Sequence, residues 1–247
     1  MVWEPLIEAV RPRGKTPPKE LRRTISAIFW RHQNGAKWRS IPAELGPWWL
    51  AAQLFIRWAK QGVWERLLDL VQQHDIALGR ASSTAPISGL TTRRRARKKG
   101  DRQPQARCAR GAWPLSRRLW HESLCDRGRA RARHCLRARP GQAHELPLAS
   151  GLLDCLPDVP GWIVGDRGFA SDAFRERVWN LGARPAIPPR RTDAPVACPE
   201  WIYANRHLVE NLRARLKEWR AVATRYEKTA RSFLGVLCIA ATADWLK

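Results

Sequence analysis

The fold is decided by the stretch WIVGDRGFASDAFRERVWNLGARPAI, residues 162–187. Its first four residues form a short apolar run typical of a buried strand. Ser171 is a good N-cap residue, and we expect the helix that it begins to cover residues 172–181 and to stop at Gly182. Residues 184–187 then predict a second strand, parallel to the first if the helix crosses over between them. The stretch therefore indicates an α/β fold.

A second informative stretch is the helix expected over residues 202–220. On a helix of 3.6 residues per turn, steps of three, four and seven residues return to one face. Four functional side chains stand at those steps: Tyr203, Arg206, Glu210 and Lys217. One carboxylate among cations and a phenol is a poor core face and a good anion-facing one. With Asp166 at the end of the upstream strand, the pattern suggests an aspartate and a glutamate that meet at a metal.

Simpler interpretations of the two carboxylates stay open. Glu210 has basic neighbours on the same helix, Arg206 and Arg213, and pairs of this kind are common on solvated helices. Asp166 alone can be a turn residue. His144 and His207 lack a set of partners that would bind a metal.

The composition favours a polyanionic partner. The 247 residues carry a formal net charge of +23, and neutralising phosphates supplies most non-specific nucleic-acid binding. No apolar run reaches the ~18 residues of a membrane span. The six cysteines show no paired spacing, so a zinc site or a disulfide framework is not expected. These features predict a reduced, cytoplasmic protein that does not enter a membrane.

The positive charge is concentrated in residues 80–139, here called the basic segment. It holds 18 Lys and Arg against 3 acidic residues, a net charge of +15, which leaves +8 for the rest of the chain. Composition alone indicates a disordered basic linker. Yet the segment also contains Trp113, Trp120 and three cysteines, which such linkers usually lack, and it has neither helical nor strand periodicity. Arg, Trp, Cys and Pro together are typical of a GC-rich gene read out of frame.

The genetic code is compatible with that alternative. Residues 82–87, Ser-Ser-Thr-Ala-Pro-Ile, have codons that give Leu-Asp-Gly-Thr-Asn in a frame displaced by one base. Residues 119–125 allow Tyr-Gly-Thr-Lys-Val-Cys in the frame displaced by one base in the other direction. Tyr-Gly-Thr-Lys-Val-Cys contains the aromatic and β-branched residues typical of strands. We therefore hypothesise a compensated frameshift over the basic segment.

The N-terminal block, residues 3–73, is predicted to be helical. Apolar periodicity indicates helices over residues 20–31 and 48–60 and a third after Gly62. Three short helices suit a helix-turn-helix-like module, and Arg39 and Arg57 are candidate contacts to DNA phosphates. Solvated helix faces explain such arginines equally well. The block's tryptophans, Trp30, Trp48, Trp58 and Trp64, are expected in the core.

Residues 141–247 and the N-terminal block resemble bacterial insertion-sequence transposases of the DDE type, in the group with the signature Tyr-x2-Arg-x3-Glu-x6-Lys. Tyr203, Arg206, Glu210 and Lys217 match the signature at every spacing. Asp166-Arg167-Gly168-Phe169 resembles the group's second-aspartate motif. The resemblance implies a ribonuclease-H-like catalytic domain in which two aspartates and a glutamate hold two divalent metals, Mg²⁺ or Mn²⁺, for strand cleavage and transfer. Asp166 and Glu210 would be metal ligands and catalytic, while Tyr203, Arg206 and Lys217 would position phosphates.

The first aspartate of the resembled family has no counterpart in the printed chain, which has Ser83-Thr84 where the displaced frame encodes Leu-Asp-Gly-Thr. We therefore expect three parts: a helical DNA-binding domain (1–75), an out-of-frame or disordered segment (76–139), and an incomplete ribonuclease-H-like domain (140–247).

The function expected is that of a DNA transposase, inactive as printed, with double-stranded transposon ends as its partner. A non-catalytic DNA-binding protein and a general nuclease are the alternatives. A homodimer is one option for the oligomeric state.

Overall fold

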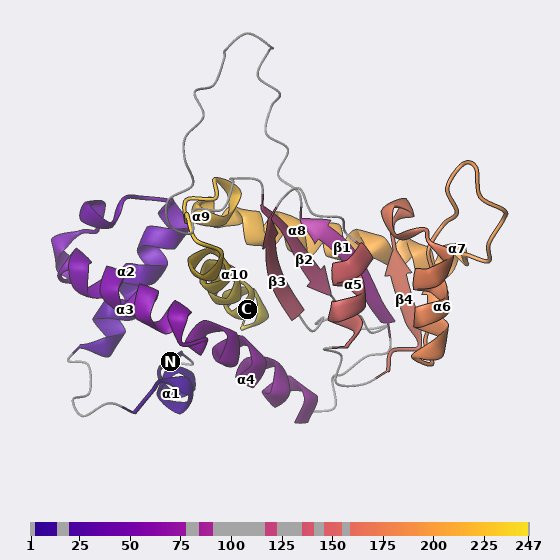
Figure 1. Cartoon of the computed structure of the whole chain (residues 1–247). Helices are drawn as coiled ribbons and strands as arrows, with labels where there is room; N and C mark the ends of the chain where they lie inside the picture. Colours follow the sequence, from indigo (N-terminus) through magenta and orange to yellow (C-terminus); the bar gives the residue numbers. More distant parts are fainter. Residues whose placement is uncertain are drawn as a thin grey trace, which may run out of the picture.

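The computed structural model describes residues 3–13, 20–77, 84–90, 117–122, 135–140, 146–154 and 159–246. A block of helices lies at one end, a sheet flanked by helices lies at the other, and the last helix runs between them (Figure 1). Among the described helices, none combines the length and the apolar character needed to cross a membrane.

Four helices form the N-terminal block: α1 (Trp3–Val10), α2 (Leu21–Asn34), α3 (Trp48–Lys60) and α4 (Val63–Ala77). Two single turns of 3₁₀ helix, η1 (Trp38–Ser40) and η2 (Ala43–Leu45), connect α2 to α3. The three helices predicted from periodicity are α2, α3 and α4. Gly35 ends α2 with φ +61°, and a Cβ there would lie 2.9 Å from the Cβ of Arg220. Glycine is therefore needed here for both conformation and space.

Five strands form one mixed sheet: β1 (Thr84–Leu90), β2 (Arg117–Glu122), β3 (Cys135–Pro140), β4 (Trp162–Gly165) and β5 (Arg184–Ala186). Their order across the sheet is β3-β2-β1-β4-β5. The pairs β3/β2 and β2/β1 are antiparallel, and β1/β4 and β4/β5 are parallel. The predicted parallel pair around residues 162–187 is thus confirmed, joined by α6 (Asp172–Asn180), whose N-cap is Ser171.

The sequence predicts a sheet without its first strands, and the structure differs. β1, β2 and β3 all lie within the basic segment; its remaining residues lie outside the described ranges. Strand pairing uses backbone groups that every residue except proline carries, so a ladder is less sensitive than periodicity to side-chain order. One conflict remains. Pro86 stands opposite Val164 in the central strand β1 and has no N–H to donate, whereas sheets ordinarily keep proline at an edge.

The remaining helices cover the sheet and complete the core. α5 (Leu146–Leu153) and α6 lie toward one face, where they share a hydrophobic cluster with Ile163 and Ile187. α7 (Glu200–Tyr203) lies toward the other face, where Ile202 and Tyr203 pack with Val164 and Ala186. Neighbouring residues of β4 thus enter different clusters, as the alternation of a strand requires. Then follow η4 (Ala204–Arg206), α8 (His207–Glu218), α9 (Arg220–Ala223) and α10 (Ala230–Trp245).

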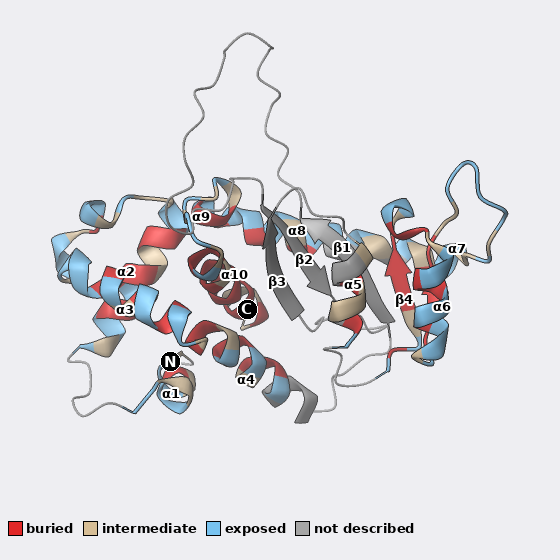
Figure 2. Ribbon diagram, in the orientation of Figure 1, coloured by how far each residue is buried: buried red, intermediate tan, exposed pale blue. Residues whose placement is uncertain are grey.

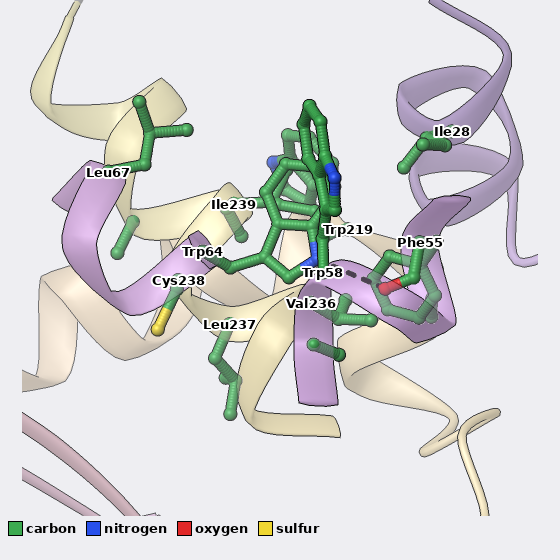
Figure 3. Packing of buried hydrophobic residues seen from close by; sticks show 14 of the residues in the cluster. Ile28, Phe55, Trp58, Trp64, Leu67, Trp219, Val236, Leu237, Cys238 and Ile239 are labelled. Atoms are coloured by element: carbon green, nitrogen blue, oxygen red, sulfur yellow. Dashed lines mark hydrogen bonds between the residues drawn. The ribbon is translucent and has the colours of Figure 1, made fainter. Parts of the chain in front are cut away.

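One hydrophobic core joins the N-terminal block to the C-terminal helices. α10 is buried along most of its length (Figure 2) and packs against α3 and α4. Figure 3 shows Trp58 and Trp64 among Val236, Leu237 and Ile239 of α10. The Trp64 indole donates a hydrogen bond to the Phe55 carbonyl at 3.3 Å. The predicted division near residue 75 therefore does not separate two cores, since packing continues across it.

The tryptophans of the N-terminal block follow the prediction with one exception. Trp58 and Trp64 are buried, and Trp30 packs partly buried against the core. Trp48 is 36% exposed, so its expected core position is wrong. It begins α3 beside the exposed Trp49, and the guanidinium of Arg39 lies over its ring, 5.5 Å from the centroid. A cation over the ring is a surface alternative to burial.

Candidate nucleic-acid and metal site

Asp166 lies at the carboxyl end of β4, where the chain turns into η3 (Arg167–Phe169). Its Oδ1 accepts a hydrogen bond from the backbone N–H of Gly168 at 2.8 Å. Phe169 closes the turn by entering the core below it. The side chain of Asp166 is half-buried. The geometry is compatible with both interpretations of Asp166. As a turn residue it accepts a backbone hydrogen bond, and as a candidate ligand it places a carboxylate at the end of a parallel strand.

The signature segment is not the single helix predicted over residues 202–220. The chain forms α7, η4, α8 and α9 there, with Trp219 in an extended conformation between the last two. The helix is interrupted because the two halves of this segment are anchored in different hydrophobic clusters. Tyr203 packs with Val164 beneath the sheet, whereas Leu212 and Leu216 enter the core shared with the N-terminal block. The tighter 3₁₀ turn of η4 lets the two anchored parts take separate directions.

Glu210 lies on α8 with its carboxylate held by arginines of the same helical segment. Its Oε1 is 3.0 Å from Arg206 Nη2 and 4.0 Å from Arg213 Nη1. The Glu210 side chain is 53% exposed. Such pairs contribute about 0.3–0.5 kcal/mol, and arginine preceding glutamate is the less favourable order. The ion pairing of Glu210 with Arg206 and Arg213, one of the alternatives considered from the sequence, is thus present and contributes little to stability.

The elements that carry Asp166 and Glu210 meet on the same sheet. η4, which directly precedes α8, contacts β4, and α8 contacts β1. β1 is therefore the strand that lies next to β4, which leads to Asp166, and also contacts α8, which carries Glu210. Its sequence, Thr-Ala-Pro-Ile-Ser-Gly-Leu, contains neither Asp nor Glu. No third carboxylate comes from the strand that is best placed to supply one.

The residues present do not fit a two-metal site. In the described part of the chain, no three His, Cys, Asp or Glu side chains gather where an ion could bind. Asp166 is engaged with a backbone N–H and Glu210 with two guanidinium groups. Hard divalent ions need several oxygen ligands, and two carboxylates are too few for a two-metal site. Asp101 and Asp126 lie outside the described residues.

The other predicted contacts to DNA differ in their surroundings. Lys217 is exposed near the end of α8, seven residues after Glu210. Arg39 and Arg57 are exposed on η1 and α3. Arg31 of α2 is 2% exposed and ion-paired with Glu227, so it does not belong with the phosphate candidates of the N-terminal block.

Two further arginines lie near this site and were not among the predicted contacts: Arg190 and Arg191 are exposed on a closed turn just after β5. Two consecutive arginines after Pro188-Pro189, at the carboxyl end of a predicted strand, were the available signal.

Comparison with known proteins places both ends of the chain in one functional class. Residues 1–68 match the family described as "Putative transposase of IS4/5 family", and residues 163–247 match the "Transposase DDE domain". Over 114 residues the chain is 32% identical to the "Putative transposase for insertion sequence element IS6501" of Brucella ovis, covering 87% of that protein and 45% of this chain. This chain belongs to the DDE-type insertion-sequence transposases.

The transposase is also 28% identical over 96 residues to "Uncharacterized protein y4sN" of Sinorhizobium fredii, covering 77% of that protein and 38% of this chain. The two family matches include the N-terminal block up to residue 68, Asp166 and Glu210. Neither includes residues 69–162, where β1 and the basic segment of the transposase lie. DDE domains in general use divalent metal ions, and β1, which has no carboxylate, falls between the matched regions.

Proposed function

We propose that this transposase binds the double-stranded DNA of transposon ends and does not cleave it. The observation that carries the proposal is the sequence of β1, which lies beside the strand of Asp166 and has no carboxylate. Phosphoryl transfer by this class relies on paired metals that clamp the attacking and leaving oxygens. With only Asp166 and Glu210 available, strand cleavage loses its metal centre while DNA binding keeps its cations.

We further propose that the catalytic half is ribonuclease-H-like. Three antiparallel strands followed by two parallel ones, in the order β3-β2-β1-β4-β5, support this fold. So does the placement of the second aspartate at the end of β4 and of the glutamate on a helix packed against the sheet. Because the sheet has all five strands, we expect inactivity to result from the absence of a catalytic carboxylate and not from loss of the fold.

DNA binding in this proposal uses Arg206, Lys217 and Tyr203 at the sheet and Arg39 and Arg57 in the N-terminal block. Arg206 is paired with Glu210 in an exposed contact worth only about a few tenths of a kcal/mol. Exchanging that carboxylate for a phosphate therefore costs little, and a guanidinium can grip two phosphate oxygens. The net charge of +23 supports the same partner.

The cause that we propose for the missing carboxylate is a compensated frameshift over the basic segment. Pro86 supports it, because proline in a central strand is poorly suited to the fold that the rest of the chain specifies. Sequencing the gene tests it directly. The proposal fails if no displaced frame at this locus encodes Leu-Asp-Gly-Thr.

The function is tested with the purified chain, labelled transposon-end duplex and either Mg²⁺ or Mn²⁺. We expect salt-sensitive binding and no cleavage, with the Asp166→Ala variant unchanged in both. End-specific cleavage that Asp166→Ala abolishes would overturn the proposal and establish an active transposase. Cleavage that ignores the end sequence would instead favour a general nuclease.

A further inference from the structure

The connection from β5 to α7 leaves the sheet at the edge where Asp166 lies. β4 and β5 are parallel, so their carboxyl ends share one edge. Gly165, just before Asp166, approaches the first residue of the connection closely: a Cβ on Gly165 would lie 3.2 Å from Ile187 Cγ1. Figure 1 shows the connection extending outward beyond β4 and α6 before the chain returns to α7.

The tip of this connection is a closed turn. The backbone N–H of Arg190 donates to Asp193 Oδ2 at 3.1 Å, and the N–H of Asp193 donates to the Arg190 carbonyl at 3.2 Å. The two bonds tie residues 190 and 193 together, and Pro188 and Pro189 restrict the backbone that leads into the turn. The tip is therefore ordered by local contacts although its side chains are exposed.

The base of the connection is fixed from the other side by α6. Arg175 is 6% exposed, donates from Nη2 to the Ile187 carbonyl at 3.4 Å and is 3.1 Å from Asp172. Ile187 itself is 1% exposed. A buried arginine that binds a loop carbonyl holds the exit of β5 in place, so the turn projects from a defined point beside Asp166.

The charges of the turn are unbalanced. Arg190 and Arg191 are exposed, and within the described ranges neither guanidinium has a carboxylate partner. The Asp193 carboxylate accepts the backbone N–H of Arg190 and so serves the turn. Arg167 adds a further exposed cation directly after Asp166 at the same edge. An ordered pair of unpartnered guanidinium groups is suited to phosphate oxygens, which accept bidentate hydrogen bonds.

We propose that the turn at residues 190–193 is a DNA-backbone clamp, in which Arg190 and Arg191 contact phosphates of DNA bound at the sheet edge where Asp166 lies. The inference rests on the DNA binding proposed above. It adds a contact outside the Tyr-x2-Arg-x3-Glu-x6-Lys signature, at the exit of the strand that neighbours β4. The prearranged turn spares part of the ordering entropy that a free loop would lose on binding.

The test compares Arg190→Gln/Arg191→Gln with a matched control, Arg177→Gln/Arg184→Gln. Both double variants lose two exposed arginines and the same charge; in the control, Arg177 is ion-paired with Asp154 and Arg184 lies over the Trp162 ring, so the folding check decides whether it can be used. Arg184 begins β5 and Arg177 lies near the end of α6, so the control removes cations from the opposite edge of the sheet. Binding of a transposon-end duplex is followed by fluorescence anisotropy as a function of salt, and folding of each variant is checked by circular dichroism.

For the turn variant, we expect the slope of log affinity against log salt to become shallower by about 0.9 for each phosphate that is no longer neutralised, and binding to weaken about tenfold or more at ~0.1 M salt. The control should keep most of the wild-type slope. Equal effects of the two folded variants would overturn the clamp while leaving the proposed function intact. A wild-type chain that does not bind DNA would overturn both.

Discussion

Arg31 of α2 is ion-paired with Glu227, which lies just before α10, and the arginine side chain is only 2% exposed. The same guanidinium lies 4.4 Å from the ring centroid of Trp38 and 4.8 Å from that of Tyr226, and donates to His32 Nδ1 at 2.8 Å. The pair joins the N-terminal block to the C-terminal helices through a buried charge.

Glu227→Gln is expected to be strongly destabilising, because it leaves the buried guanidinium without a counter-charge. Breaking one partner of a buried pair costs about 3–5 kcal/mol in the free energy of unfolding. Urea denaturation followed by circular dichroism measures this. Glu44→Gln is the control, since Glu44 is exposed on η2 and should change stability by less than about 0.5 kcal/mol. Similar values for the two variants would show that the pair is not structural.

Stability should fall in mildly acidic solution because of His32. Burial, and secondarily the neighbouring Arg31 charge, hold the pKa of His32 well below its ordinary value of 6.5. The folded state therefore keeps His32 neutral while the unfolded state binds a proton below about pH 6.5. Its contribution is fully present above that pH and is lost as pH falls toward the folded pKa, by about 1.4 kcal/mol per pH unit.

The measurement for His32 is the unfolding free energy at about pH 7.5 and about pH 5.5, on either side of the ordinary histidine pKa. The drop between the two should shrink in His32→Gln and persist in His207→Gln, because His207 is more accessible to solvent. An unchanged pH dependence in the His32 variant would assign the effect to other groups.

Gly35→Ala should be more destabilising than Gly62→Ala. Both glycines have positive φ, +61° and +67°, where a side chain costs about 1–2 kcal/mol. Only at Gly35 would the new Cβ also clash, at 2.9 Å from Arg220 Cβ; at Gly62 the nearest atom is Arg66 Nη1 at 3.7 Å, an ordinary contact distance. The excess loss in thermal unfolding measures the tightness of the contact between α2 and α9. Equal losses of stability in the two variants would mean that α2 and α9 can move apart to admit the new Cβ at little cost.

Displacing the reading frame of the gene across codons 80–139 is expected to restore cleavage of transposon-end DNA with Mg²⁺. The reason is that the displaced frame supplies the aspartate that β1 lacks, at about residue 84, where β1 begins and pairs with Trp162 of β4. Single-turnover cleavage assays compare the protein encoded with the displaced frame with the protein of the present sequence. Asp166→Ala in the frame-restored protein is the control. A restored, folded chain that binds ends and does not cut them would contradict this explanation of inactivity.

The sequence predicted the parts of the fold whose local signals agree with one another. The β4–α6–β5 unit has an apolar run, a serine cap and a terminating glycine, and it forms as expected. Helices α2, α3 and α4 followed their apolar periodicity. The strands of the basic segment were missed because their residues carry no alternation, so only long-range pairing with β4 places β1.

The sequence predicted which residues line the candidate site, but it did not predict the hydrophobic clusters and the burial around them. Spacing put Glu210 on one face with Arg206, and the structure has that pair at 3.0 Å. Spacing could not show that Tyr203 and Leu212 belong to different hydrophobic clusters, which interrupts the helix between them. Nor could it show that Arg31 is buried, since burial depends on Trp38 and Tyr226 from other elements.

The core that α10 shares with α3 and α4 has a consequence for how the protein is made. The N-terminal block leaves the ribosome first, yet its apolar faces stay uncovered until the final helix has been synthesised. A frameshift without later compensation would remove α10 and leave Trp58 and Trp64 exposed on an aggregation-prone fragment. A frameshift of the kind proposed is therefore compatible with folding only if the original frame returns before α10 is encoded.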